Sequence, residues 1–368
     1  MPGQAQDDLL SDRDYMRLAL DLAERGRLTA RPNPMVGAVV VKSGRIVGSG
    51  YHVRPGTRHA EVNALADVPD DVAKGSTVYV SLEPCDFTGR TPACSDLLVA
   101  REVSRVVCAM EDPDDRVAGS GLAKLKAAGI DVEVGVLAEQ AERLNLAYLT
   151  HRRLGRPYVT LKMAQSTDGS TATLSGDSKW ITGPEARKRG HAIRAEAQVV
   201  AVGIGTVLAD NPTLNVRHSK GEDPVKVVFD SDLRTPLDAN VLDGERCILC
   251  AAETADADRA QAFRDRGVDV WICESVDGKP DVRDVLKRLG ERDVIRVLVE
   301  GGSRLASSFL NARMIDRVAV FTAPKLMGGM PSIADLGIKT MKDVISLENS
   351  VVERIGQDLY YGADVRFV

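Results

Sequence analysis

Residues 77–94 read Thr-Val-Tyr-Val-Ser-Leu-Glu-Pro-Cys-Asp-Phe-Thr-Gly-Arg-Thr-Pro-Ala-Cys, a β-branched run followed by two cysteines, Cys85 and Cys94. Upstream, His59-Ala60-Glu61 opens a predicted helix. One histidine and two cysteines are a known ligand set for catalytic zinc, which keeps a fourth position open for water. Glu61 follows the histidine by two residues, so it can carry a proton from that water to a leaving amine. The pattern therefore predicts a zinc-dependent deaminase.

Each part of this pattern also has a simpler interpretation. A histidine before Ala-Glu is an ordinary helix start, and a cysteine after a strand is usually a core residue. A binding or regulatory protein could also keep zinc as a structural clip, but a closed structural site needs a fourth Cys or His. The three residues occur together, each at a predicted junction between elements. Cys94 lies in a helical first turn, where the helix dipole favours a thiolate. Together they favour catalysis.

Composition limits the classes of function. The chain has 368 residues, which is longer than one hydrophobic core usually supports, so two domains are expected. The net charge of −5 and the 4% aromatic content argue against nucleic-acid binding, including a nucleic-acid deaminase. No stretch of roughly twenty apolar residues and no signal peptide is evident, so we expect no membrane partner. Six cysteines in this length fit a reducing cytoplasm rather than a disulfide framework.

Predicted strands and helices alternate along the whole chain, which indicates an α/β protein. The charged segment 151–157, with its glycine and proline, interrupts the alternation, and we place the boundary between a domain of residues 1–152 and one of 153–368 there. The expected strands are 36–41, 46–51, 77–82, 105–110, 132–136, 158–163, 199–203, 225–230, 247–251, 268–273, 294–300, 318–323 and 363–368. The expected helices are 13–26, 59–66, 96–100, 121–128, 139–149, 184–195, 281–289 and 305–312.

In the second half, two strands end at glycines. The first exit is Gly203-Ile204-Gly205-Thr206, and the second is Glu300-Gly301-Gly302-Ser303-Arg304. Glycines at a helix start let backbone N–H groups approach a phosphate. Neither stretch matches G-x-G-x-x-G, so a Rossmann dinucleotide site is not predicted. An ordinary turn without a bound ligand remains the alternative interpretation of these glycines. Cys247 and Cys250 have metal-like spacing, but the period of a strand sends them to opposite faces, which favours a structural role.

Several longer motifs resemble those of a known enzyme family. The deaminase motifs are Pro32–Gly37, Gly50–His52, His59–Glu61, Leu82–Cys85 and Gly89–Cys94, with eight residues between the two cysteines. The later motifs include Leu161–Ala164, Ser175–Thr182, Gly205–Pro212, Val299–Gly302 and Ala323–Leu326. The chain closely resembles the bifunctional deaminase/reductase of riboflavin biosynthesis. That resemblance implies a cytidine-deaminase-like N-terminal domain followed by a dihydrofolate-reductase-like C-terminal domain.

The resemblance also implies chemistry and cofactors. The first domain would use Zn²⁺, held by His59, Cys85 and Cys94, to hydrolyse the 2-amino group of 2,5-diamino-6-ribosylamino-4(3H)-pyrimidinone 5′-phosphate. The second would use NADPH to reduce the ribosyl group to ribityl. A homo-oligomer is expected, with a small phosphorylated pyrimidine as the partner molecule.

Site residues carried over from the family fall into groups. Glu61 is the proton carrier, and Lys162 and Asp210 are the polar pair expected nearest the reducible carbon. In the deaminase, Asn33 and His52 are expected to line the pyrimidine pocket, and Arg90 is expected to help hold the ribose phosphate. In the reductase, substrate contacts are expected at Ser178, Arg194, Leu214, Arg217 and Glu300. NADPH contacts are expected at Ala164, Trp180, Thr206, Asp210, Ser231, Gly302, Ser303, Arg304, Leu305, Ala306, Ser307 and Ser308.

Two places depart from the family pattern. The family has Ser-His-x-Gly after its first zinc cysteine, whereas this chain has Asp86-Phe87-Thr88-Gly89. In the reductase, S-L-D-G-[KR] becomes Ser166-Thr167-Asp168-Gly169-Ser170, which loses a basic residue. Because the lost histidine would serve the substrate pocket, a paralogue that acts on another pyrimidine or a pteridine-like substrate, or that has one weakened activity, is the alternative.

Overall fold

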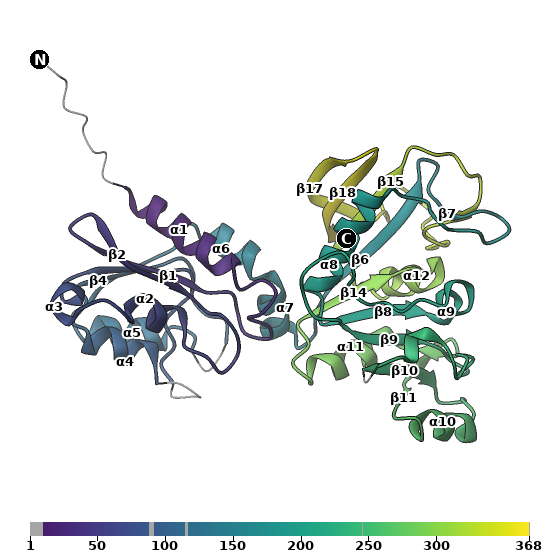
Figure 1. The fold of residues 1–368 in the computed structure, drawn as a ribbon, viewed down its shortest axis with the longest axis horizontal. Coiled ribbons are helices and arrows are strands. Elements are labelled where there is room, and N and C mark those ends of the chain that lie inside the picture. The colour runs from purple at the N-terminus through teal and green to yellow at the C-terminus, as the bar shows by residue number, and fades with distance from the viewer. Residues whose placement is uncertain (1–9, 88–91, 115–116, 245, 368) are drawn as a thin grey trace, which may run out of the picture. The chain divides into compact units, whose positions relative to one another are not determined.

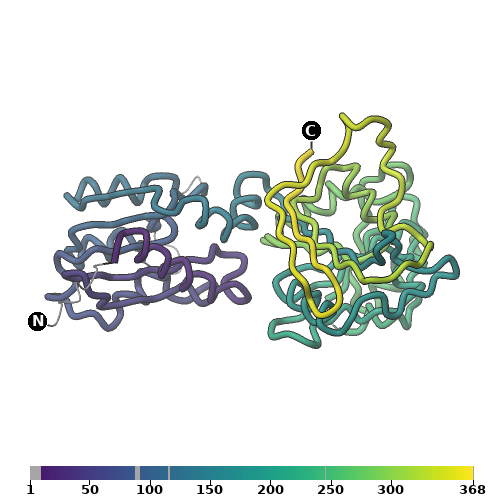
Figure 2. The backbone as a smooth tube through the Cα atoms, turned by 90° about the horizontal axis from the view of Figure 1, so that it is seen from above, coloured from purple at the N-terminus to yellow at the C-terminus, as the bar shows by residue number. Residues whose placement is uncertain are grey.

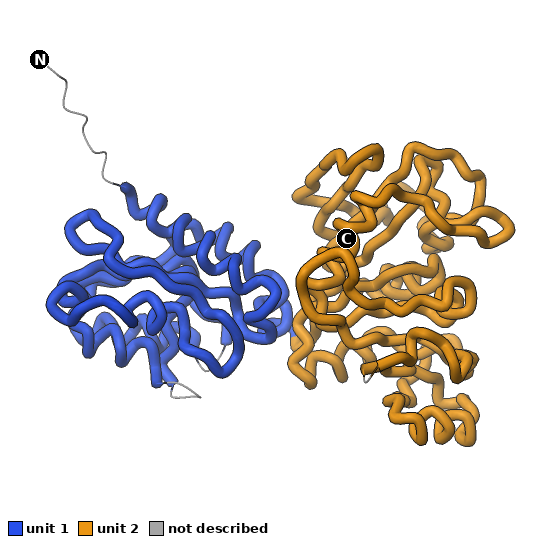
Figure 3. The backbone as a smooth tube through the Cα atoms, in the orientation of Figure 1, with its two compact units in different colours: residues 1–154 blue, residues 155–368 orange. Residues whose placement is uncertain are grey.

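The computed structural model describes residues 10–87, 92–114, 117–244 and 246–367. The chain divides into two compact units, residues 1–154 and 155–368, coloured separately in Figure 3. Arg90, expected to contact substrate, lies outside the described residues.

The first unit is built on a five-stranded sheet in the order β2-β1-β3-β4-β5. β1 pairs antiparallel with β2 and β3, whereas β3, β4 and β5 run parallel. Parallel neighbours end at the same edge of a sheet, so the segments after β3 and β4 are brought together. The strands are β1 (Gly37–Lys42), β2 (Arg45–Tyr51), β3 (Thr77–Val80), β4 (Arg105–Cys108) and β5 (Asp131–Val134).

Helices cover both faces of this sheet (Figure 1). Alternating strand residues separate the two cores: Val40 packs with α2, α4 and α5, while Val39 packs with α1, α6 and α7. The result is a three-layer α/β/α unit. The helices are α1 (Asp12–Glu24), α2 (Ala60–Leu65), α3 (Asp70–Ala73), α4 (Cys94–Ala100), α5 (Ser120–Ala127), α6 (Ala138–Leu144) and α7 (Leu146–Leu154).

The sequence-based expectation of one helix over residues 139–149 was wrong in detail. The chain forms α6 and α7, with Asn145 between them. The buried Asn145 side chain accepts from the Met35 N–H at 2.9 Å and donates to the Met35 carbonyl at 3.0 Å, which ties the break to the start of the unit. Helix α7 then continues through Leu154, into the segment expected to be a linker.

The second unit has a nine-stranded sheet in the order β11-β10-β9-β8-β14-β6-β15-β18-β17. The strands from β11 to β15 are parallel, and the C-terminal hairpin, yellow in Figure 2, adds β18 and β17 in antiparallel pairing. The strands are β6 (Tyr158–Ser166), β8 (Val199–Gly203), β9 (Val225–Phe229), β10 (Cys247–Ala252), β11 (Asp269–Cys273), β14 (Arg296–Glu300), β15 (Arg317–Ala323), β17 (Ser346–Ile355) and β18 (Asp358–Arg366).

Two clusters of buried apolar side chains cover the faces of this sheet. One includes residues of α11 and α12, and the other includes residues of α9 and α10. The helices are α8 (Pro184–Glu196), α9 (Ile204–Asp210), α10 (Ala257–Arg264), α11 (Val282–Gly290) and α12 (Ser303–Asn311), with a 3₁₀ turn at Asn240–Leu242. The short strands β7 (Ser170–Ala172), β12 (Ser275–Val276), β13 (Lys279–Pro280) and β16 (Met330–Pro331) form two small ladders.

Cys247 and Cys250 lie on opposite faces of β10, as the period of a strand predicts. Cys247 packs in the cluster that contains α10 residues, and Cys250 in the cluster that contains α11 residues. A pair split by a sheet cannot share one metal ion, so their spacing is a consequence of strand geometry.

Among the described residues, no helix has the length and apolarity needed to cross a bilayer.

Candidate functional site

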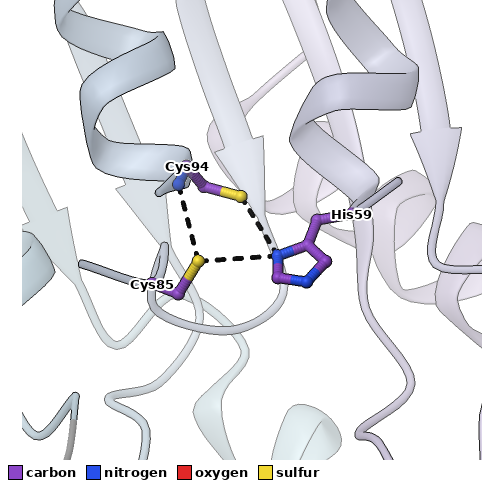
Figure 4. A group of neighbouring side chains, drawn as sticks. All are labelled: His59, Cys85 and Cys94. Atoms are coloured by element: carbon purple, nitrogen blue, oxygen red, sulfur yellow. Dashed lines mark hydrogen bonds between the residues drawn. The ribbon is translucent and has the colours of Figure 1, made fainter. Parts of the chain in front are cut away.

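Two cysteines and a histidine converge at one edge of the first sheet (Figure 4). Cys85 follows β3, Cys94 is the first residue of α4, and His59 caps the N-terminus of α2. His59 Nδ1 lies 3.3 Å from Cys94 Sγ and 3.5 Å from Cys85 Sγ, and the three ligand atoms lie within 4.8 Å of one another. The three residues predicted to bind zinc are therefore brought together.

The donor set fits zinc in chemistry and in spacing. Zn–S bonds of about 2.3 Å and Zn–N bonds of about 2.0 Å, at a tetrahedral angle, separate N and S ligands by roughly 3.5 Å. The His59–Cys85 and His59–Cys94 separations lie at this value. The Cys94 backbone N–H points at Cys85 Sγ, at 3.4 Å, so the start of α4 supports a thiolate. A hydrogen bond from Cys94 lowers the pKa of Cys85 to about 4.

Glu61 lies beside this cluster and is almost fully buried. Burial raises its pKa to about 7, and the neighbouring Cys85 adds to the effect. A carboxyl group with that pKa can both accept and release a proton near neutral pH, which is what general acid–base catalysis needs. Glu61 also lines the cavity that includes His59 and Cys85.

Asn33 and His52 line the same cavity, as expected for substrate contacts. The two side chains are 3.0 Å apart, from Asn33 Nδ2 to His52 Nε2. His52 Nδ1 faces the Arg58 carbonyl at 3.3 Å, so Nδ1 carries the proton and Nε2 accepts from Asn33. Burial lowers the pKa of His52, which keeps the ring neutral. This hydrogen bond fixes the amide of Asn33 and leaves its carbonyl oxygen for a ligand.

The substituted Asp86-Phe87 pair divides between two environments. Phe87 lines the cavity. Asp86 instead accepts from Ser95 Oγ and pairs with Lys124 Nζ, both at 2.8 Å. The Asp86 carboxylate is thus committed outside the cavity lining and cannot supply the donor that a histidine would give. Thr88 lies outside the described residues.

Sequence reasoning gave no role to several residues that shape this cavity. Glu83 is buried and accepts four backbone N–H bonds, from Asp112, Gly119, Gly121 and Leu122, at 3.0–3.3 Å. It therefore holds the segment after β4 in place. The sequence carried no direct signal for this role, because the role depends on β3 and β4 being parallel neighbours whose carboxyl ends meet.

Tyr148 and Arg152 complete the cavity lining from α7. Their spacing of four residues puts both on one helix face. The Tyr148 hydroxyl donates to Asp112 at 2.9 Å, and Arg152 Nε lies 3.5 Å from Asp114 Oδ2. Arg152 was missed because residues 151–157 were expected to be a linker, whereas Tyr148 lay within the expected helix 139–149 and was given no role there.

In the second unit, a buried ion pair links three expected site residues. Glu300 ends β14, and Lys162 is its neighbour in register on β6. Arg194 of α8 donates twice to Glu300, from Nε and Nη2, at 2.8 Å each, and Lys162 Nζ lies 3.8 Å from Glu300 Oε2. Burial opposes ionisation of Glu300, but Arg194 and Lys162 outweigh it and lower its pKa to about 2.

Lys162 and Asp210, the two polar residues expected nearest the reducible carbon, have different ion-pair partners in the structure. Lys162 pairs with Glu300, whereas Asp210, at the end of α9, accepts from Ser178 Oγ at 3.3 Å and pairs with Lys179 Nζ at 3.5 Å. The reason is register: β6 pairs with β14, which puts Lys162 opposite Glu300.

The two glycine-containing strand exits meet in space. A side chain at Gly301 would lie 3.2 Å from Thr206 Oγ1, and one at Gly302 would lie 3.5 Å from it. Both glycines have positive φ, of 90° and 79°, and Gly302 caps α12. Two expected NADPH residues, Thr206 and Gly302, thus lie together at a helix N-terminus, a location that favours phosphate.

The remaining expected NADPH residues differ in what they offer. Leu305 and Ala306 bury their side chains in the core, so only their backbone is free to contact a ligand. Ser307 Oγ donates to the Ala334 carbonyl and Ser308 Oγ to the Arg304 carbonyl. Trp180 is 62% exposed with Arg187 Cζ 4.6 Å from its ring centroid. Ala164 lies on β6, and Ser231 follows β9.

The expected substrate residues Leu214 and Arg217 lie in the segment between α9 and β9. Leu214 is buried, with a positive φ of 54°. Arg217 donates from Nη1 to Thr213 Oγ1 at 3.0 Å, and its N–H faces His191 Nδ1 at 3.3 Å. Burial and the nearby Arg194 lower the pKa of His191 to about 4, so it accepts as a neutral ring.

Fold and site together define a two-part enzyme, with a zinc-dependent deaminase domain and a separate α/β domain. The cytidine and deoxycytidylate deaminase zinc-binding region matches residues 10–110, and the RibD C-terminal domain matches residues 157–361. The riboflavin biosynthesis protein RibD of Aquifex aeolicus is 44% identical over 349 residues, covering 95% of this chain and 97% of that protein. The Escherichia coli RibD is 39% identical over 370 residues, covering 95% and 98%.

Solved structures agree. Acinetobacter baumannii RibD superposes with a TM-score of 0.87 at 36% identity, covering 96% of this chain and 99% of that one. A Thermotoga maritima diaminohydroxyphosphoribosylaminopyrimidine deaminase/5-amino-6-(5-phosphoribosylamino)uracil reductase gives 0.84 at 34% identity, covering 97% and 99%. The chain belongs to the RibD family of bifunctional riboflavin-biosynthesis deaminase/reductases. Because both domains are present, the alternative of a paralogue that serves another pathway is not favoured.

Proposed function

We propose that this protein hydrolyses the 2-amino group of 2,5-diamino-6-ribosylamino-4(3H)-pyrimidinone 5′-phosphate in residues 1–152 and reduces the ribosyl group of the product in residues 153–368. The observation that carries the proposal is the His59–Cys85–Cys94 cluster beside the buried Glu61. The boundary between the two compact units falls between residues 154 and 155, which supports domain bounds close to 1–152 and 153–368. Ammonia release and NADPH oxidation by the purified protein with this pyrimidine test it, and absence of both would refute it.

In the deaminase, His59, Cys85 and Cys94 would hold zinc, which supplies an activated water to the site. Glu61 takes a proton from the attacking water and gives it to the amino nitrogen, which leaves as ammonia while oxygen remains on C2 of the ring. The pKa of about 7 suits both directions of transfer. Asn33, fixed by His52, accepts from the pyrimidine through its free carbonyl oxygen.

In the reductase, bound NADPH would supply the hydride that reduces C1′ of the sugar. The Gly301–Gly302 turn at the start of α12, with Thr206 beside it, would hold the cofactor phosphates. Lys162 delivers the proton that goes to the ring oxygen as the C1′–O bond opens. Glu300 holds both Lys162 and Arg194, and Arg194 and Arg217 contact the substrate, where a guanidinium suits a phosphate.

Replacing Arg194 with methionine is expected to lower kcat/KM for NADPH oxidation by roughly 10- to 100-fold, because a charge-assisted contact to the substrate is lost. Glu300 would lose its bidentate partner. Ammonia release should be unchanged. Lys188→Met, at an exposed position on the same helix, is the matched control. Equal kcat/KM values in the two variants would remove Arg194 from the reductase site.

Phe87→His is expected to raise deaminase kcat/KM by roughly 10- to 100-fold, because a hydrogen bond left unmade in a site costs about 1–3 kcal/mol. The Asp86 carboxylate is engaged by Ser95 and Lys124, so it does not already fill this role. The measurement is ammonia release by both proteins on the riboflavin intermediate. A lower value in the variant would mean that Phe87 is adapted to this reaction, and equal values would remove it from the functional argument.

We also propose a cellular location and an assembly state for the protein. The reduced cysteines that the ligand set requires fit the cytoplasm. We propose a homo-oligomer whose small-molecule partner is the phosphorylated pyrimidine. Measuring the molecular mass in solution tests the oligomeric state.

A further inference from the structure

The deaminase cavity has to accept a doubly charged phosphate although much of its polar lining is acidic. Glu61, Glu83, Asp112 and Asp114 all line it. A phosphate dianion next to carboxylates needs a compensating cation. Among the described residues that line the cavity, Arg152 is the one with a permanent positive charge.

We infer that Arg152 binds the 5′-phosphate of the deaminase substrate. The inference rests on the proposed function and adds to it a residue that determines selectivity for the phosphorylated substrate. It depends on where the guanidinium is held and on which of its donors are available.

The backbone of α7 and two side chains hold this guanidinium at the cavity. Its Nε lies 3.5 Å from Asp114 Oδ2, too far for a good hydrogen bond but close enough for an ion pair. Its Cζ lies 5.3 Å from the centroid of the Tyr148 ring, one helical turn earlier. Tyr148 is itself fixed by its hydrogen bond to Asp112.

The terminal amino groups of Arg152 remain for a ligand. Nε is buried and faces Asp114, yet 27% of the side chain is exposed. The exposed part therefore lies on other atoms of the side chain. In the part of the chain that the structure describes, Asp114 is the ion-pair partner of Arg152, and no hydrogen bond uses its terminal nitrogens. A guanidinium has five N–H donors, so it can face a carboxylate on one edge and a phosphate on the other.

A purely structural ion pair would not need this arrangement. An exposed guanidinium can pair with an acid anywhere on the surface and gains little from it. Here Asp114, which pairs with the guanidinium, is buried, and the Tyr148 ring near the guanidinium is hydrogen-bonded to a second buried acid, Asp112. These three residues and Arg152 all line the cavity. Asp114 and Tyr148 act as positioning residues for Arg152.

The test compares ammonia release from the phosphorylated pyrimidine and from the same pyrimidine without its phosphate, using the zinc-loaded full-length protein. Arg152→Met should lower kcat/KM on the phosphorylated substrate by roughly 10- to 100-fold, mainly through a higher KM, because a charge-assisted contact is lost. On the dephosphorylated substrate, kcat/KM should stay within about twofold of wild type. Arg152→Lys should recover part of the loss, since it keeps the charge.

Arg153→Met is the matched control. Arg153 is the next residue on α7, is 54% exposed, pairs with Glu142 at 3.7 Å, and does not line the cavity. It should leave both substrates unaffected.

Equal losses on both substrates in Arg152→Met, or no loss on either, would overturn the inference. If that variant unfolds, Arg152→Lys decides alone: a loss confined to the phosphorylated substrate supports phosphate binding, and any other pattern overturns it. A wild-type protein that released no ammonia from either substrate would instead refute the proposed deaminase function.

Discussion

Replacing Cys94 with alanine is expected to remove zinc from the protein and to lower ammonia release by at least about 10³-fold, because the metal's charge stabilisation is worth several kcal/mol. Two ligands on His59 and Cys85 would remain, and a catalytic zinc site needs three. NADPH oxidation with the deaminated substrate should continue near the wild-type rate, since the reductase residues belong to the other compact unit. Metal analysis and the two assays measure these results.

The control for this variant is Cys108→Ala. Cys108 is also buried in the first unit, on β4, where its thiol donates to the Met110 carbonyl at 3.0 Å, but it is not part of the metal-ligand cluster. Its loss should cost packing and leave the zinc content unchanged. Full zinc content in Cys94→Ala would mean that the ion is held elsewhere, and loss of NADPH oxidation in that variant would contradict two independent sites.

Glu61→Gln should leave zinc bound and lower ammonia release by roughly 10²-fold or more, the contribution typical of general acid–base catalysis. Glutamine keeps the size of the side chain, so the buried position stays filled, but the amide can neither take the proton from water nor return it to the leaving nitrogen. The fall should appear in kcat, because Glu61 acts on the reacting atoms.

Glu139→Gln provides the comparison. Glu139 is an exposed residue of α6 that pairs with Arg143 at 3.2 Å, and its charge lies outside the cavity lining. Zinc content, ammonia release and NADPH oxidation should all match wild type. Undiminished turnover in Glu61→Gln would sink the assignment of Glu61 as the proton carrier, and a loss of zinc would reassign it to a structural role at the metal.

Among the elements that the sequence predicted, those with strong local signals occur in the structure. The apolar runs of β1, β3, β4, β8 and β14 read as strands because both faces of each sheet are covered. Two elements that we did not expect have weaker signals. Helix α9 begins at Ile204, with Gly203 as its N-cap, and its start was read as a turn. Helix α10 is short, and half of its residues are polar.

Strand β17 shows why periodicity can fail. Its residues, Ser346–Ile355, are exposed on both sides except at the ends, so they show no alternation of polar and apolar side chains. The segment is a strand because β18 pairs with it along its length. The stability of such a strand comes from its contacts with a neighbouring strand. The periodicity of its own sequence cannot show that such a neighbour exists.

The sequence by itself determined the zinc cluster and the order of strands and helices, because ligand types beside element ends and apolar periodicity are local properties. Only the tertiary structure decided which charges meet. Lys162 faces Glu300 because β6 and β14 are neighbours in register. Arg152 reaches the cavity because the buried Asn145 turns the chain into α7, which extends into a segment that reads as a linker. Ion pairs depend on distances across the fold, and those distances are set by strand register and helix packing, not by sequence spacing.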